Sequence, residues 1–309
     1  MSNRTDFPGV SHGMRRFSRY AHPALLIACC AFSLMAPPTS SAQAAPDVRI
    51  TWAPERPVQG TLFRVRVAAD IGEARVEGSI AGEPLHFSKS AAGWEALAAA
   101  PLDKGAELGL TIAIASSSGV DSVRAKIPIA RGSYTLEKLT VAPRFGTPPD
   151  SALQARMDRE RERALAVSRA SHFTPRLWNE VHKPRDTRIT SAFGSGREFN
   201  GQIQSRHTGT DFAGAVGTPV RAAARGVVAL VDTFYLAGRV IYIDHGEGLV
   251  SAYFHLSRQD VAVGDTVAAG QQIGLVGATG RVTGPHLHWV VRYGAISVDP
   301  LSFLAIAKP

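Results

Sequence analysis

Short alternations of apolar and polar residues mark the chain between residues 46 and 142. Every second side chain of an extended strand points to the same face, so this alternation predicts strands buried on one side. The clearest runs centre on Ile50, Val65 and Ile112, and glycines separate them. We expect an antiparallel β-sandwich of immunoglobulin-like type here. Because the segment has no cluster of His, Asp or Glu, we interpret it as a packing or binding module.

A different pattern follows in residues 143–178. A break rich in Pro and Gly at residues 143–149 precedes a run of good helix formers at residues 151–171. Acidic and basic residues alternate at residues 156–163. Such balanced charge is typical of a solvated helical face rather than of a nucleic-acid-binding arm. We therefore predict a linker that contains one helix.

Residues 179–309 again read as strands. Of the 29 glycines, 17 lie in the 122 residues from Arg188 onward, between runs rich in Val and Ile such as residues 226–231 and 239–243. Many short strands joined by glycine turns predict a second all-β domain with an antiparallel sheet. The chain as a whole is thus expected to be mainly β.

The first 44 residues have the pattern of a cleavable signal peptide. Four arginines precede an apolar run at residues 24–36, which is too short for a helix across a membrane core of about 30 Å. Small residues ending in Ala42–Gln43–Ala44 supply the cleavage site. This pattern predicts export to the periplasm or cell envelope, with no membrane-spanning segment in the mature chain. Alternatively, Leu26–Ile27–Ala28–Cys29 resembles a lipoprotein box, which would leave a protein anchored through Cys29.

Composition changes this picture in two ways. Only two cysteines occur, Cys29 and Cys30, so a disulfide framework and a zinc site built from separated cysteines are excluded. The net charge is +8, from 34 basic and 26 acidic residues. Without the four Arg and one Asp of residues 1–44 it becomes +5, from 30 basic and 25 acidic residues. This modest excess suits an anionic surface such as cell wall and does not indicate nucleic-acid binding.

Candidate chemistry is concentrated in three segments of the second domain. His207 and Asp211 are four residues apart, and His255 lies within Tyr-Phe-His-Leu-Ser. His286 and His288 are two residues apart and share a face if they lie on a strand. Two imidazoles and a carboxylate are the ligand set of a catalytic zinc site that keeps one position open for water. No cysteine competes for such a role in the mature chain.

These segments together resemble the lysostaphin/LytM family of zinc metallopeptidases. The resemblance covers about residues 189–300 and rests on H-x-x-x-D, Y-x-H-L-S and G-P-H-L-H. It implies a duplicated-hybrid type of β-sheet fold, one Zn²⁺ per chain, and hydrolysis of peptide bonds in peptidoglycan. Carried over residue by residue, it makes His207, Asp211 and His288 the metal ligands. His255 and His286 become the catalytic histidines that are not ligands, with the choice of base between them left open.

The resemblance also leaves alternatives. Some relatives have degenerate sites and act as non-enzymatic activators of other cell-wall hydrolases, which gives a second function for this chain. The N-terminal domain could then bind a cell-wall enzyme. Latent relatives block zinc with an asparagine, for which Asn200 is a poor candidate. The cleaved bond is not identified by the sequence.

Several neighbouring residues are assigned packing roles. His245 lies in a strand-turn segment, Asp-His-Gly-Glu-Gly, and is interpreted as structural. Tyr253 and Trp289 are expected in the apolar core or in the wall of the groove that binds the substrate. Ser251 and Ser257 have no acid–base partner at a recognisable spacing, so we do not expect a serine nucleophile.

Overall fold

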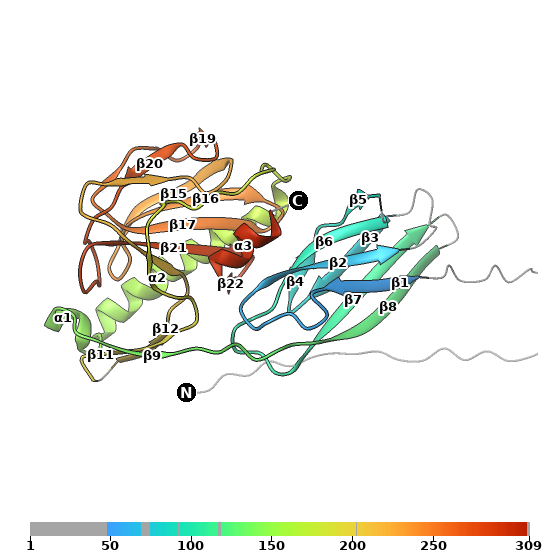
Figure 1. The fold of residues 1–309 in the computed structure, drawn as a ribbon, viewed down its shortest axis with the longest axis horizontal. Helices are drawn as coiled ribbons and strands as arrows, with labels where there is room; N and C mark the ends of the chain where they lie inside the picture. Colours follow the sequence, from blue (N-terminus) through green and yellow to red (C-terminus); the bar gives the residue numbers. More distant parts are fainter. Residues whose placement is uncertain (1–47, 69–74, 92, 117–118, 202, 308–309) are drawn as a thin grey trace, which may run out of the picture. The chain divides into compact units, whose positions relative to one another are not determined.

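The computed structural model describes residues 48–68, 75–91, 93–116, 119–201 and 203–307. The predicted signal peptide and its Cys29 lie outside these residues. The described part is mainly β, as expected, and its strands form two separate groups of sheets (Figure 1). Within the described ranges, no helix combines the length and the apolar character needed to cross a membrane.

Residues 49–128 form two four-stranded antiparallel sheets around one apolar core. The strand orders are β1–β2–β6–β5 and β4–β3–β7–β8. The strands are β1 (Arg49–Ala53), β2 (Leu62–Ala68), β3 (Arg75–Ile80), β4 (Glu83–Leu85), β5 (Ser88–Ser90), β6 (Gly93–Ala99), β7 (Glu107–Ser116) and β8 (Gly119–Pro128). Val65 and Ile112 are buried in this core, whereas Arg66 points to solvent. The predicted β-sandwich is confirmed.

A long helix follows the sandwich, as the charge pattern predicts. This helix, α2 (Ser151–Ala170), comes after the short α1 (Pro143–Gly146) and continues into the 3₁₀ turn η1 (Ser171–Phe173). Asp150 caps it, since its carboxylate accepts the Leu153 N–H at 2.7 Å. Ala164 and Ser168 are buried, whereas most of the charged side chains are exposed. The helix therefore packs through a narrow face of small residues.

The second domain is built on an eight-stranded sheet. Its order is β10–β13–β21–β17–β16–β15–β19, with β22 beside β21, and every pairing is antiparallel. The strands are β10 (Ile189–Ser191), β13 (Thr210–Ala213), β15 (Gly226–Phe234), β16 (Gly238–Gly246), β17 (Leu249–Leu256), β19 (Thr266–Val267), β21 (His286–Tyr293) and β22 (Ile296–Val298). A small sheet of β14 (Pro219–Arg221), β20 (Gln272–Leu275) and β18 (Arg258–Gln259), and the helix α3 (Pro300–Ile306), complete the domain.

Both faces of the large sheet are covered. One face contributes Tyr253, Leu287 and Trp289 to the main apolar cluster. The other contributes Val250 and Val290 to a cluster that includes Ala164 of α2. Because both faces are covered, nearly every residue of β17 and β21 is buried rather than every second one. The central strands β17 and β21 of this sheet carry His255 and His288.

A third sheet lies beside these strands and includes a segment from before α2. It has the order β12 (Ile203–Arg206), β11 (Gly196–Phe199) and β9 (Leu136–Leu139). β9 runs parallel to β11, with Glu137 opposite Arg197. Residues 136–139 were expected to belong to the N-terminal sandwich, which we predicted to end at residue 142. In the structure they supply a strand to the second domain instead.

Candidate metal centre

Strand pairing places the three predicted metal ligands next to one another. His207 lies between β12 and β13, and Asp211 is the second residue of β13. β13 pairs antiparallel with β21, and the register sets Asp211 directly opposite His288. Residues opposite each other on adjacent strands have neighbouring side chains, so the sheet itself joins two segments that lie far apart in the sequence.

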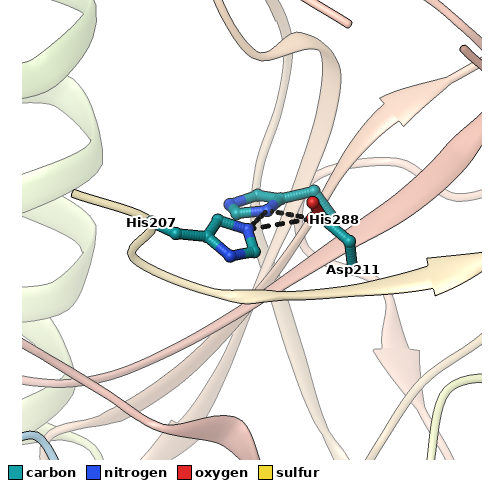
Figure 2. Close-up of side chains that lie close together, drawn as sticks. All are labelled: His207, Asp211 and His288. Atoms are coloured by element: carbon teal, nitrogen blue, oxygen red, sulfur yellow. Dashed lines mark hydrogen bonds and ion pairs between the residues drawn. The ribbon is translucent and has the colours of Figure 1, made fainter. Parts of the chain in front are cut away.

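The three side chains converge on one point, as Figure 2 shows. His207 Nε2 lies 3.0 Å from Asp211 Oδ1 and 2.9 Å from His288 Nδ1, and His288 Nδ1 lies 2.7 Å from Asp211 Oδ1. All three residues are buried. One atom from each can act as a ligand, so together they form a set able to hold a metal ion.

The hydrogen bond made by His207 Nδ1 determines the position of the ring proton, and Nε2 is the nitrogen that faces Asp211 and His288. Nδ1 lies 2.8 Å from the carbonyl oxygen of Ala192, which can only accept, so Nδ1 carries the proton. Ser191 Oγ lies 3.1 Å from the same nitrogen but donates its proton to Glu137 at 2.6 Å. The tautomer with its proton on Nδ1 presents Nε2 to Asp211 and His288, the arrangement that orients a metal-binding histidine.

The charges of the cluster fit a cation. Burial opposes ionisation of Asp211, but its contacts with His207 and His288 outweigh this and hold the carboxyl pKa well below its ordinary value. Burial lowers the pKa of His288 to about 4, although Asp211 opposes the shift. The lone pair of His207 Nε2 and the carboxylate oxygen are both acceptors only 3.0 Å apart, so a proton or a cation must lie between them. Two imidazoles and one carboxylate match the ligands that zinc prefers at catalytic sites.

The second oxygen of Asp211 is held by an arginine. Arg197 on β11 donates from Nη2 to Asp211 Oδ2 at 2.5 Å and from Nε to Glu137 Oε2 at 3.1 Å. It also donates to Ser191 Oγ at 2.9 Å. Glu137 on β9, Arg197 and Asp211 thus form a continuous polar chain, which fixes the orientation of the carboxylate.

The two predicted catalytic histidines lie beside the cluster, with their ring centroids 4.9 Å apart. His255 Nδ1 donates to the carbonyl of Thr279 at 2.8 Å, and His286 Nδ1 donates to the carbonyl of Gly284 at 2.8 Å. Each ring therefore keeps Nε2 for other partners, and His286 Nε2 lies 3.8 Å from Asp211 Oδ1. Burial and the neighbouring His286 and His288 hold the pKa of His255 well below its ordinary value.

His255 also has an unusual backbone conformation. Its φ of 63° lies in the left-handed region, which residues with a side chain rarely adopt. In this conformation the His255 N–H donates to Ala237 O at 2.9 Å, and Nδ1 donates to Thr279 O at 2.8 Å. Such a conformation lowers the stability of the fold, and residues that adopt it are concentrated at functional sites.

Two cavities border the cluster. The larger has a volume of about 570 Å³ and reaches Asp211 and His286. The smaller, of about 190 Å³, reaches His207, His255 and His288. Arg197, Phe199 and Arg281 line both. A substrate bound along these cavities therefore has access to all five sequence-predicted site residues.

The other sequence candidates lie elsewhere or are engaged in packing. Asn200 binds the backbone of Val141 through both side-chain atoms, at 2.9 and 3.1 Å, and does not join the His/Asp cluster. Tyr253 and Trp289 are fully buried in the main apolar cluster. His245 is fully buried and bound at both ring nitrogens, to Arg225 O at 2.9 Å and Ser251 Oγ at 2.7 Å.

Sequence reasoning missed three polar residues of the site: Glu137, Arg197 and Arg281. Glu137 and Arg197 follow no motif spacing, because only the pairing of β9 with β11 brings them to Asp211. Arg281 lies five residues before His286 in Gly-Arg-Val-Thr-Gly-Pro-His, where its proximity to the histidine motif was the one available signal.

Comparisons with known proteins agree with this geometry. The model of peptidase family M23 matches residues 205–300, which include all five residues predicted for the site. The chain is 42% identical over 115 residues to the peptidoglycan DD-endopeptidase ShyC of Vibrio cholerae, a match that covers 37% of this chain and 26% of the relative. It is 42% identical over 123 residues to the DD-carboxypeptidase/endopeptidase Mpg of Neisseria meningitidis, covering 40% and 28%. The chain thus spans about a quarter of the length of these relatives.

One solved structure matches beyond the second domain. The crystal structure of a peptidase M23 from Pseudomonas aeruginosa is 29% identical, has a TM-score of 0.62, and covers 81% of this chain and 95% of its own. Because the match exceeds the length of the second domain, the fold similarity extends into the sandwich and linker. Residues 205–300 thus form a peptidase family M23 domain.

Proposed function

We propose that this protein is a zinc-dependent endopeptidase that hydrolyses peptide bonds in the stem peptides or cross-links of peptidoglycan. The observation that carries the proposal is the convergence of His207, Asp211 and His288 beside the free Nε2 atoms of His255 and His286. The names of the relatives, a peptidoglycan DD-endopeptidase and a DD-carboxypeptidase/endopeptidase, support the substrate. They also support a location in the cell envelope, where peptidoglycan lies.

In this proposal, His207, Asp211 and His288 would hold one zinc ion. Zinc at such a site lowers the pKa of a coordinated water and polarises the carbonyl of the scissile bond. The hydrogen bond from His207 to Ala192 and that from Arg197 to Asp211 orient the ligands. The regulatory alternative is not favoured, because no ligand position of the cluster is missing.

The chain's own histidines supply proton transfer. The Nδ1–H groups of His255 and His286 are bound to backbone carbonyls, so Nε2 of each ring faces the reacting groups. Burial keeps His255 in the neutral form, which accepts a proton from the attacking water. As the C–N bond breaks, the protonated imidazole gives this proton to the nitrogen of the leaving amine. Until it gives up this proton, the imidazole can also donate its Nε2–H to the oxyanion that develops on the carbonyl.

The test separates metal binding from proton transfer. Zinc content and release of fragments from purified peptidoglycan are measured for the full chain and for His288→Ala and His255→Ala. We expect His288→Ala to lose both zinc and activity. We expect His255→Ala to keep zinc but lose roughly a hundredfold or more in rate. Undiminished digestion by a His288→Ala protein that holds no zinc would contradict the proposal.

A further inference from the structure

Arg281 is a positively charged side chain held at the metal centre without a partner. Its guanidinium stacks on the ring of Phe199, with Cζ 3.9 Å from the ring centroid, and its backbone N–H bonds to Leu236 O at 2.8 Å. Across the part of the chain that the structure describes, the guanidinium has neither an ion pair nor a hydrogen bond. Stacking covers one face of the group and leaves the N–H groups at its edge available for an acceptor in the same plane.

The charge of Arg281 is not neutralised by its surroundings. Burial and the nearby Arg197 lower its pKa to about 10, so it stays cationic at neutral pH. Arg197 differs, because its guanidinium already binds Asp211 and Glu137. A half-buried cation without a counter-ion is costly, so its presence beside a metal centre calls for an acceptor supplied by a ligand.

The position of Arg281 connects this charge to the reaction. It lines both the 570 Å³ cavity, which reaches Asp211 and His286, and the 190 Å³ cavity, which reaches His255 and His288. A peptide that lies through both cavities with its scissile bond at the cluster therefore passes Arg281 close to that bond. The two acids that line the larger cavity, Glu137 and Asp211, are both bound to Arg197, and Arg188 at its border is exposed. Among the described residues, the side-chain charge along these cavities that no neighbouring residue neutralises, which includes that of Arg188 and Arg281, is therefore positive.

We propose that Arg281 binds a carboxylate of the substrate peptide on the residue next to the scissile bond. This inference rests on the function proposed above and adds a specificity to it. The planar fork of a guanidinium forms two parallel hydrogen bonds with a carboxylate, whereas a carboxamide supplies one acceptor and no charge. The enzyme therefore prefers cross-links whose carboxylate beside the cut bond is free over cross-links in which that group is amidated. Arg281 acts in this way as a specificity-determining residue.

The test uses two synthetic cross-linked peptides that differ only at this group, one with the carboxylate and one with the carboxamide. With the zinc-loaded full chain, we expect kcat/KM for the acid to exceed that for the amide roughly tenfold to hundredfold. Arg281→Gln removes most of this preference by lowering the acid value alone, and Arg281→Lys, which keeps the charge without the fork, gives an intermediate preference. Arg258→Gln, which removes an exposed arginine of the same domain, keeps the full preference. Equal losses on both peptides in both Arg281 variants overturn the inference.

A binding measurement separates Arg281 from the metal. Affinity for the two peptides is measured by calorimetry with chelator-treated protein, in which no bond is cleaved. A preference for the acid that persists without metal and disappears in Arg281→Gln supports the proposal. A preference present only in the zinc-loaded protein assigns the carboxylate to the metal and overturns it. If the wild-type enzyme cleaves both peptides equally, the inference fails and the proposed function stands. If it cleaves neither peptide nor peptidoglycan, the proposed function fails.

Discussion

At the scale of single residues, the histidines of the second domain differ in what their ring nitrogens contact. His207, His255 and His286 each bind a backbone carbonyl through Nδ1 and keep Nε2 for the centre. His245 also binds a carbonyl through Nδ1, but its Nε2 lies 2.7 Å from Ser251 Oγ. Ser251 Oγ lies 3.0 Å from the Tyr253 hydroxyl, which in turn accepts the Ala223 N–H at 2.7 Å. This buried chain uses both nitrogens of His245 and supports its structural interpretation.

Burial of His245 makes the stability of the fold depend on pH. Burial lowers its pKa from 6.5 to about 4, against the hydrogen bond to Arg225 O. In the unfolded chain the imidazole takes up a proton near pH 6.5, whereas in the folded chain it stays neutral until about pH 4. The free energy of unfolding therefore falls as the pH drops through this window, by up to about 3 kcal/mol.

Urea unfolding of the chelator-treated protein between pH 7.5 and 4 measures this loss without interference from metal release. We expect His245→Gln to be less stable at pH 7.5 and to show a shallower pH dependence between 6.5 and 4. His182→Gln is the matched control, because it removes an exposed imidazole of the same domain and leaves His245 in place. Equal pH dependence in wild type and His245→Gln would assign the effect to other groups.

At the scale of elements, the sequence predicts strands better than it predicts their partners. Alternation around Val65 and Ile112 identified sandwich strands because burial on one face leaves a local period of two. The H-x-H spacing likewise follows from a strand, β21. β9 has the sequence Leu-Glu-Lys-Leu, carries no such signal, and pairs with β11, about 60 residues away. Glu137 and Arg197 could not be predicted, since their role depends on this non-local pairing.

The pairing of β9 with β11 predicts that Glu137 positions the proposed metal ligand Asp211 through Arg197. Glu137→Gln removes the charge that holds Arg197 Nε at 3.1 Å, so Arg197 and the Asp211 carboxylate lose their fixed orientation. We expect zinc affinity to fall roughly 10- to 100-fold, as is typical when an outer partner of a metal ligand is altered. Competition with a chromophoric chelator measures this affinity independently of catalysis.

The matched control for Glu137 is Glu107→Gln, which removes an exposed carboxylate of the sandwich that pairs with Lys126. It should bind zinc as the wild type does. Unchanged zinc affinity in Glu137→Gln would mean that Arg197 holds Asp211 without help from β9.

At the scale of the whole molecule, the sandwich and the second domain share buried contacts. Leu62 and Ala99 of the sandwich belong to the same apolar cluster as Trp178 and Phe303. The Leu62 N–H donates to Ser302 Oγ at 3.0 Å. A sequence pattern reports which faces are apolar but not which surface covers them, so this contact was not among the predictions.

A polar contact between the two domains offers the clearest test of their coupling. Glu83 on β4 lies 2.9 Å from His172 Nε2 and accepts the Ala295 N–H at 2.9 Å, with both side chains largely buried. His172 Nδ1 lies 2.8 Å from His86 Nε2. Burial raises the pKa of Glu83, but His172 and the Ala295 N–H outweigh it, so the pKa lies below its ordinary value of 4.5.

Replacing Glu83 by Gln should therefore uncouple the domains. The change replaces the carboxylate that contacts His172 Nε2 and the Ala295 N–H by a neutral amide, and weakens the contact by roughly 1–3 kcal/mol. Because the folded pKa of Glu83 is depressed, the wild type holds this stability above pH 4.5 and loses it as the pH falls through the folded pKa. In calorimetry at pH 7 we expect Glu83→Gln to unfold at a lower temperature, with separate transitions for the sandwich and the second domain.

The matched control is Glu77→Gln, on the exposed Arg75–Glu77 pair of the same sheet, which should leave the wild-type trace unchanged. One unshifted transition in Glu83→Gln would show that the apolar contact at Leu62 and Phe303 couples the two domains without the Glu83–His172 contact.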